Sequence, residues 1–275
     1  MPLSLDQIDA FTHRPFAGNP AAVCLLPEPA GEDWMQSVAE EMRLSETAFV
    51  SPDGEEWRLR WFTPKCEVQL CGHATLAAAH CLWERGLADR GAAIRFRTIH
   101  SGVLVCTRED DRIAMDFPAR PAREAEPPTG LLDALGCAAT RVARGPYDWL
   151  VEVADPAGVR SLNPDFRALR KYDVRGVIVT SRGDGRPYDI VSRFFAPGAG
   201  VDEDPVTGSA HCTLAPWWQE RIGDRDILAY QASARGGELR IRARGDRVRL
   251  SGGAVTITRG HLSESAAHAS FGSPA

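Results

Sequence analysis

A strand-to-helix segment occurs twice in this chain of 275 residues, and the repeat restricts the possible folds more than any other feature. Each copy reads R-x-F-x-P, runs on to a glycine and then enters an apolar helix. The residues that recur in the same order are Arg60, Phe62, Pro64, Gly72 and Ala74 in the first half and Arg193, Phe195, Pro197, Gly208 and Ala210 in the second. This order favours a duplicated, two-lobed protein over two buried helices that are alike only in composition.

Strand-like runs outnumber helical patterns in both halves, which predicts an α+β fold. Apolar residues at helical spacing predict an amphipathic helix from Asp33 to about Arg43, and the segment 72–86 is apolar on nearly every side, as in a fully buried helix. Residues 118–130 carry four prolines and no apolar periodicity. We therefore predict an N-terminal lobe at 1–117, a linker at 118–130 and a C-terminal lobe at 131–275.

Composition narrows the classes of partner and compartment. A formal net charge of -5 gives no basic surface for nucleic acid or an anionic membrane. Asp6 and Asp9 interrupt any signal peptide, and no apolar stretch approaches the roughly 18 residues of a membrane helix. The seven cysteines are scattered and odd in number, which is typical of reduced thiols. We expect a cytoplasmic protein whose partner is a small molecule.

The repeated segment itself suggests an anion site. Two helix N-termini brought towards one cleft by a duplicated fold would present unpaired backbone N–H groups to a carboxylate. Gly72 and Gly208 at the helix starts would let a ligand approach the backbone closely. The two copies differ beside these glycines, since the first supplies His73 and the second supplies Asp204 and Ser209. Such asymmetry suits a site that distinguishes the two ends of its ligand.

Glu46 is the candidate proton carrier. It forms a polar break in LSETAFV, between Leu44 and a buried-looking strand, so its carboxyl is expected to be half-buried at a helix-to-strand turn. A positioned carboxylate of this kind can take a proton from carbon and return it. The alternative from the pattern alone is a surface glutamate at a helix end.

Longer motifs resemble a known family. The segments are DQIDAFTHRPFAGNPAAVCL, LSETAFV, LRWFTPKCEVQLCGHATLAAAH and RFFAPGAGVDEDPVTGSAHCTLA, and together they resemble the phenazine-biosynthesis PhzF-like family in content and order. The resemblance implies the diaminopimelate epimerase-like fold, in which two pseudo-symmetric lobes each wrap a β-barrel-like sheet around a central helix. It also implies a cofactor-independent isomerase of a biosynthetic process, with no bound metal, and a homodimer.

The resemblance further implies a role for each site residue. Glu46 matches the carboxyl that moves a proton between carbons of a small cyclic or amino carboxylic acid. The substrate-binding positions of the family map onto Gly72, His73, Asp204, Gly208 and Ser209. The identity of the substrate does not follow from these matches.

Three other functions were weighed. A thiol-dependent amino-acid epimerase needs one cysteine per lobe, but Cys71 has no counterpart before Gly208, and Cys71 is better interpreted as a packed small residue. A metal site is disfavoured because Cys66, Cys71, His73 and His80 lack metal-binding spacings. A non-catalytic ligand-binding or protein-interaction module of the same fold stays open.

Pro216 is expected to kink or end the second repeated helix.

Overall fold

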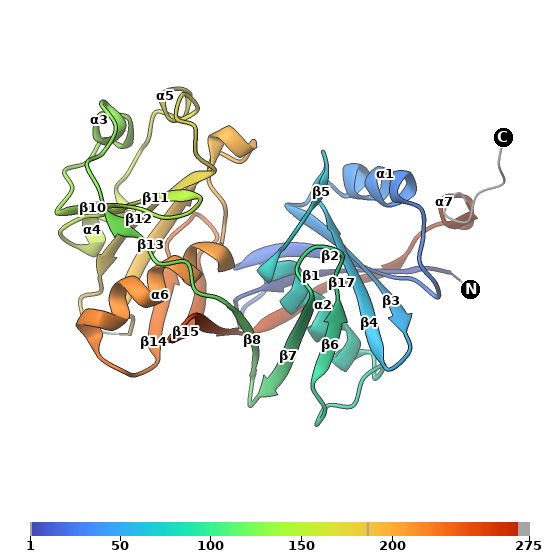
Figure 1. The fold of residues 1–275 in the computed structure, drawn as a ribbon. Helices are drawn as coiled ribbons and strands as arrows, with labels where there is room; N and C mark the ends of the chain where they lie inside the picture. The colour runs from blue at the N-terminus through green and yellow to red at the C-terminus, as the bar shows by residue number, and fades with distance from the viewer. Residues whose placement is uncertain (1, 186, 269–275) are drawn as a thin grey trace. The chain divides into compact units, whose positions relative to one another are not determined.

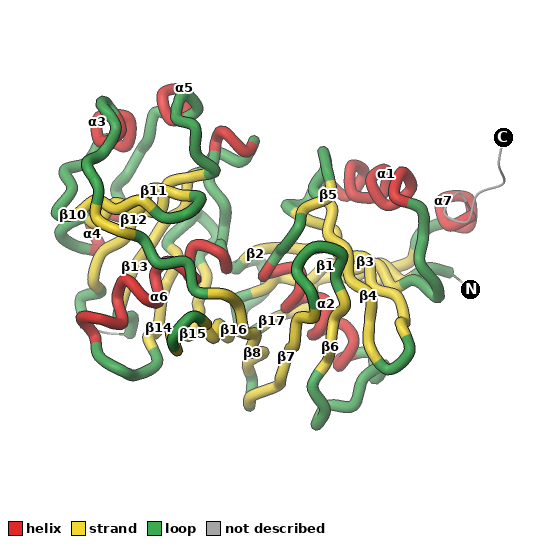
Figure 2. The backbone as a smooth tube through the Cα atoms, viewed as in Figure 1, coloured by secondary structure: helices red, strands yellow, loops and turns green. Residues whose placement is uncertain are grey.

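The computed structural model describes residues 2–185 and 187–268, and the chain divides into two compact units (Figure 1). The first unit contains the residues up to Asp116 and those from Ser251 onward, and the second contains Phe117–Leu250. Both units are rich in strands and each contains one long buried helix, as the tube in Figure 2 shows. No helix of the described ranges is long and apolar enough to span a bilayer.

The first unit is a sheet with two longer helices. Its strands are β1 (Ser4–Ala10), β2 (Asn19–Leu25), β3 (Glu46–Asp53), β4 (Glu56–Phe62), β5 (Glu67–Val68), β6 (Ile94–Arg97), β7 (Val103–Glu109), β8 (Arg112–Pro118) and β17 (Ala254–His261). Its helices are α1 (Glu32–Met42), α2 (Gly72–Glu84) and the short α7 (Glu264–His268). Helix α2 packs against β1, β2, β3 and β17, so the strands surround a central helix.

The second unit repeats this plan of strands with one long helix. Its strands are β9 (Arg123–Glu124), β10 (Arg141–Arg144), β11 (Asp148–Glu152), β12 (Gly176–Arg182), β13 (Ile190–Phe195), β14 (Ile227–Gln231), β15 (Gly237–Arg244) and β16 (Arg247–Gly252). Its helices are α3 (Leu131–Leu135), α4 (Pro156–Arg160), α5 (Phe166–Leu169), the 3-10 helix η1 (Pro197–Ala199) and α6 (Gly208–Ile222). Helix α6 packs against β14 and β15.

Strand pairing supports the duplication. In the first unit β1–β2 is antiparallel, β2–β3 parallel, β3–β4 antiparallel, β4–β6 parallel and β6–β7 antiparallel. In the second unit β10–β11, β11–β12, β12–β13, β13–β14 and β14–β15 follow the same alternation. Because parallel neighbours require a crossover connection, an identical series of directions in both units is a demanding match.

The arginine of the repeat has a defined structural role. Arg60 lies over the ring of Phe62, 5.1 Å from its centroid, and its Nε donates to Glu67 at 2.7 Å. Three residues of the second unit make the same contacts. Arg193 lies over the ring of Phe195, 4.8 Å from its centroid, and its Nε donates to Glu203 at 2.7 Å. In each unit the bond ties the end of a strand to the segment that leads into the long helix. The arginine of the R-x-F motif therefore fixes this connection through its bond to the glutamate, and we call this arginine–glutamate pair the staple.

Register identifies what faces what in the two copies. Thr47 of β3 pairs with Phe62, and Val177 of β12 pairs with Phe195. Glu46 is the residue before Thr47 in the first unit, and Gly176 is the residue before Val177 in the second. A Cβ at Gly176 would meet the Phe194 ring at 2.5 Å and the Phe195 carbonyl oxygen at 2.8 Å. The second unit thus has no room for a side chain where the first carries a carboxyl.

Pro216 was expected to kink or end helix α6, and of these two alternatives the structure excludes an end at Pro216. Helix α6 continues to Ile222. Proline removes the N–H that would bond to the carbonyl of Cys212, four residues earlier. That carbonyl instead accepts the backbone N–H of Arg120 at 3.0 Å. A neighbouring segment supplies the missing donor, which the local sequence could not show.

The units differ from the expected lobe boundaries at two places. Strand β17 pairs with β1 along its length, so the last described strand groups with the first unit and not with the second. Within the expected linker, β9 pairs with β10 of the second unit. The expected buried helix at 72–86 is observed as α2, with buried side chains on all its faces.

Candidate active site

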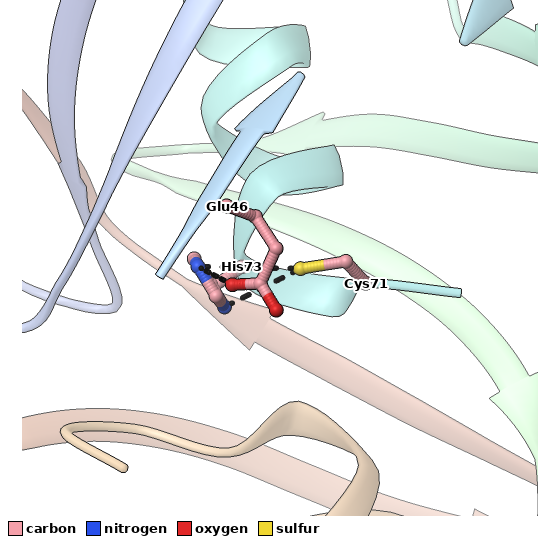
Figure 3. A group of neighbouring side chains, drawn as sticks. All are labelled: Glu46, Cys71 and His73. Atoms are coloured by element: carbon pink, nitrogen blue, oxygen red, sulfur yellow. Dashed lines mark hydrogen bonds and ion pairs between the residues drawn. The ribbon is translucent and has the colours of Figure 1, made fainter. Parts of the chain in front are cut away.

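The first unit brings Glu46 and His73 together. Glu46 is the first residue of β3 and His73 is the second residue of α2. A carboxylate oxygen of Glu46, Oε2, lies 3.0 Å from Nε2 of His73. The side chains are 19% and 6% exposed, respectively. Figure 3 shows the Glu46 carboxylate pointing at the His73 ring. The Cys71 sulfur lies beyond the carboxylate, on the same side of the ring.

Two further groups contact the His73 ring, Asn19 at Nδ1 and Cys71 at both nitrogens. The side-chain amide of Asn19 lies 3.2 Å from Nδ1 of His73, and the sulfur of Cys71 lies 3.5 Å from the same atom. Asn19 is held in turn by Ser45, whose hydroxyl donates to the amide oxygen at 3.4 Å. The imidazole is thereby fixed from both ring nitrogens, and only Nε2 faces the Glu46 carboxylate.

Charge at this cluster follows from burial and pairing. Burial disfavours the charged imidazole, but the adjacent Cys71 and the Glu46 carboxylate outweigh it, so the pKa of His73 is raised well above its ordinary value. Burial, reinforced by the Glu46 charge, raises the pKa of the Cys71 thiol. A neutral thiol contributes no charge near neutral pH. We therefore attribute the protonated state of His73 to Glu46, with which it forms an imidazolium–carboxylate pair.

Backbone geometry places this cluster at a helix start. Cys71 is the extended residue that precedes α2, and Gly72 is its first helical residue. The N–H groups of the first turn have no intrahelical partner and mark the positive end of the helix dipole. The predicted residues Glu46, Gly72 and His73 are thus neighbours within one unit.

In the second unit, Asp204 is held in the loop that precedes α6. Its carboxylate accepts the Thr207 hydroxyl. The buried side chain of Gln231 clamps the same loop, because its amide group donates to the Asp204 carbonyl at 2.7 Å and accepts the Thr207 N–H at 2.9 Å. Thr207 occupies the position before Gly208 that Cys71 occupies before Gly72. The second copy therefore carries a hydroxyl where a two-thiol enzyme would need its second sulfur.

Ser209 is the counterpart of His73 and has a cationic partner. Its hydroxyl oxygen accepts from Nη1 of Arg175 at 2.8 Å. Arg175 is itself fixed by the buried carboxylate of Asp148, which it contacts through both Nε and Nη2. With its oxygen engaged by Arg175, the Ser209 hydroxyl keeps its own hydrogen for donation to a ligand.

Three of these residues escaped prediction from sequence. Asn19 stands in the turn-like PFAGNP, Arg175 precedes an apolar strand, and Gln231 ends one. A signal existed for Gln231 and Asn19, since each is a polar residue at the edge of an apolar run. Arg175 has no such signal, because its role depends on contacts with Asp148 and Ser209, which are distant in sequence.

Comparison with known proteins bears on the family and the fold of this chain. Residues 8–260 match the family described as phenazine biosynthesis-like protein. A protein of Halalkalibacterium halodurans named as an uncharacterized isomerase is 50% identical over 256 residues, which cover 93% of this chain and 96% of that protein. A PhzF-family crystal structure from Enterococcus faecalis is 38% identical, with a TM-score of 0.91, and the match covers 96% of this chain and 100% of that one.

A more distant neighbour bears on the fold alone. The crystal structure of a probable proline racemase from Agrobacterium radiobacter matches with a TM-score of 0.64 at 11% identity, covering 95% of this chain and 93% of that one. Together these structures establish the α+β, diaminopimelate epimerase-like fold that the motifs predicted.

Proposed function

This chain belongs to the phenazine biosynthesis-like family, and on that premise we propose that it is a cofactor-independent isomerase in which Glu46 moves a proton between carbons of a small cyclic or amino carboxylic acid. The observation that carries the proposal is the pairing of the Glu46 carboxylate with His73, 3.0 Å apart and largely buried. The names of the relatives support the coarser assignment to the isomerases.

The cluster suits proton transfer by one carboxylate. His73 lies 3.0 Å from the Glu46 carboxylate and orients it, so that it can act as a base that accepts a proton from carbon. Once protonated, the same carboxyl returns the proton to a second carbon of the bound molecule. The reaction is an isomerisation with no net gain or loss of protons. It needs a single carboxyl, consistent with the glycine at the equivalent place in the other unit.

Substrate binding is the role proposed for Gly72, His73, Asp204, Gly208 and Ser209. The local geometry supports it, because both glycines begin long helices with unpaired N–H groups in their first turns. Ser209 accepts a hydrogen bond from Arg175, which orients its hydroxyl so that its hydrogen can be donated to a carboxylate group.

The thiol-dependent alternative is disfavoured on two grounds. Thr207 stands where the second thiol would be needed. Burial raises the pKa of Cys71, which disfavours the thiolate that such a mechanism requires. A non-catalytic protein of this fold would incorporate no deuterium from D₂O into the carbon atoms of its ligand.

A deuterium screen tests the proposal. Small cyclic and amino carboxylic acids are incubated with the protein in D₂O, and incorporation of deuterium at carbon is scored by mass spectrometry. We expect a substrate to gain deuterium with the wild type and with Glu41→Gln, which changes an exposed glutamate of the same unit, but not with Glu46→Gln. Equal incorporation by Glu46→Gln and wild type would refute the role of Glu46.

Two companion proposals rest on the family alone. We propose a cytoplasmic homodimer, and light scattering would give about twice the 30.0 kDa of one chain. A mass of one chain at micromolar concentration would contradict the dimer.

A further inference from the structure

Three different metal-binding groups converge at the Glu46 cluster. One donor atom each from Glu46, Cys71 and His73 lies within 4.8 Å of the other two. The donors are a carboxylate oxygen, a sulfur and an imidazole nitrogen, and they come from β3, the residue before α2, and the first turn of α2. Their sequence spacing resembles no standard metal motif, so only the fold reveals the set.

The separations fit a tetrahedral ion. Bond lengths of about 2.0–2.3 Å to oxygen, nitrogen and sulfur place donor atoms about 3.3–3.7 Å apart around zinc. Here Nε2 of His73 lies 3.0 Å from Glu46 Oε2 and 4.0 Å from the Cys71 sulfur. The first separation is slightly shorter and the second slightly longer than this range, so a bound ion would require small side-chain shifts.

The second ring nitrogen is already fixed, as in metal sites. Ligating histidines are held through their other nitrogen by a polar group that orients the ring. Asn19 lies 3.2 Å from Nδ1 of His73, whereas Nε2 lies 3.0 Å from Glu46 Oε2 and the Cys71 sulfur lies between 3.5 and 4.0 Å from the two ring nitrogens.

One donor atom lacks a hydrogen bond. Glu46 Oε2 is buried and accepts no hydrogen bond from any residue in the described ranges, since its approach to His73 Nε2 has ion-pair distance without hydrogen-bond alignment. A buried carboxylate oxygen with spare acceptor capacity favours an additional positive ligand.

We propose that Glu46, Cys71 and His73 form a site for a thiophilic divalent cation of the Zn²⁺ class, which inhibits the protein. The mixed sulfur, nitrogen and oxygen set selects Zn²⁺ or Co²⁺ over Mg²⁺ and Ca²⁺, which prefer oxygen. Cys71 binds as the thiolate and His73 as the neutral imidazole, and their protons pass to solvent. Inhibition rests on the proposed function, because the ion occupies the carboxylate that carries the proton.

Cobalt spectroscopy tests the site without reference to turnover. The metal-free full chain is titrated with Co²⁺ alone, and the thiolate-to-cobalt charge-transfer absorption is followed in the near ultraviolet. We expect one equivalent to produce the band and Zn²⁺, but not Mg²⁺, to abolish it. The band should vanish in Cys71→Ser and persist in Cys66→Ser, which changes the exposed cysteine of the same segment.

A second variant guards against a folding defect in the first. Glu46→Gln should keep the band but weaken Co²⁺ affinity by at least about tenfold. Thermal unfolding of the metal-free proteins shows whether Cys71→Ser and Glu46→Gln are folded. No band in the wild type, or a band that survives Cys71→Ser or disappears in Cys66→Ser, would overturn the site. A Co²⁺ band together with full activity of Glu46→Gln would instead overturn the proposed function and leave the site standing.

Discussion

At the scale of single residues, the Glu46–His73 pair couples stability to protonation. Each partner removes a cost of burial from the other, so loss of one leaves an uncompensated buried group. Their separation of 3.0 Å and low exposure place the pair in a weakly screened environment.

The raised pKa of His73 predicts a specific pH dependence. A raised folded-state pKa contributes stability that is fully present below the unfolded value of about 6.5 and is lost as pH rises through the folded value. The stability advantage of the wild type over His73→Gln should therefore shrink from acidic to alkaline pH in urea unfolding. An advantage that is constant with pH would show that folding leaves the pKa of His73 unchanged, and one that shrinks on acidification would show that the folded imidazole is neutral.

His211 predicts the opposite dependence. Burial lowers its pKa to about 4, and its Nδ1 contacts the Thr207 carbonyl at 2.8 Å. The unfolded state takes up a proton first as pH falls, so stability present above about 6.5 is lost on acidification through about 4, with a magnitude of roughly 3 kcal/mol.

The matched variant is His211→Asn, which offers an amide N–H in place of Nδ1 and does not titrate. Its free energy of unfolding should fall less than that of the wild type between pH 6.5 and 4. Identical slopes for the two proteins would contradict a neutral buried His211.

At the scale of elements, the connection from strand to long helix is stapled by an arginine in both units. Arg60 and Glu67 are 15% and 18% exposed, whereas the pair of Arg170 and Asp202 on the surface is 56% and 50% exposed. Charge-assisted, two-pronged bonds in partly buried places are stronger than exposed ion pairs.

A double-mutant cycle measures this difference. Arg60→Met, Glu67→Gln and their combination should give a coupling energy of about 1–3 kcal/mol in denaturant unfolding. The Arg170–Asp202 pair serves as the control and should give about 0–1 kcal/mol. Equal coupling in the two cycles would contradict the staple.

Much of this element plan could be predicted from the sequence. Apolar periodicity predicted α1, a run that is apolar on nearly every side predicted α2, and the R-x-F-x-P repeat predicted the duplication that the strand directions support. Of the two effects predicted for Pro216, a kink or an end of the helix, the end was wrong, because the donor for the Cys212 carbonyl comes from Arg120, which is distant in sequence. Among the site residues, Glu46 and His73 stood in recognisable motifs, but the contacts of Asn19 and Arg175 depend on pairing between strands.

At the scale of the whole molecule, the fold is not a simple tandem. The first unit is completed by the far end of the chain, since β17 pairs with β1 from Ser4 to Ala10. Contacts so distant in sequence form late and are costly in loop entropy. The first unit therefore depends on the complete chain.

Deleting residues 253–275 tests that dependence. The deletion leaves β1 without one neighbour and exposes one side of α2, which contacts β17. We expect loss of cooperative unfolding and rapid proteolysis of the first unit, whereas Arg259→Ala on the surface of β17 should behave like the wild type. A truncated chain that unfolds cooperatively at the same urea concentration would contradict this account.

The central claim is that one carboxyl, Glu46, carries the proton. Its most direct test is the turnover number of Glu46→Gln with a substrate found by the deuterium screen. General acid–base catalysis contributes about 10²–10⁴-fold, so kcat should fall by at least about 100-fold while ligand affinity and melting temperature stay close to those of the wild type. A kcat for Glu46→Gln within threefold of the wild-type value would contradict the claim.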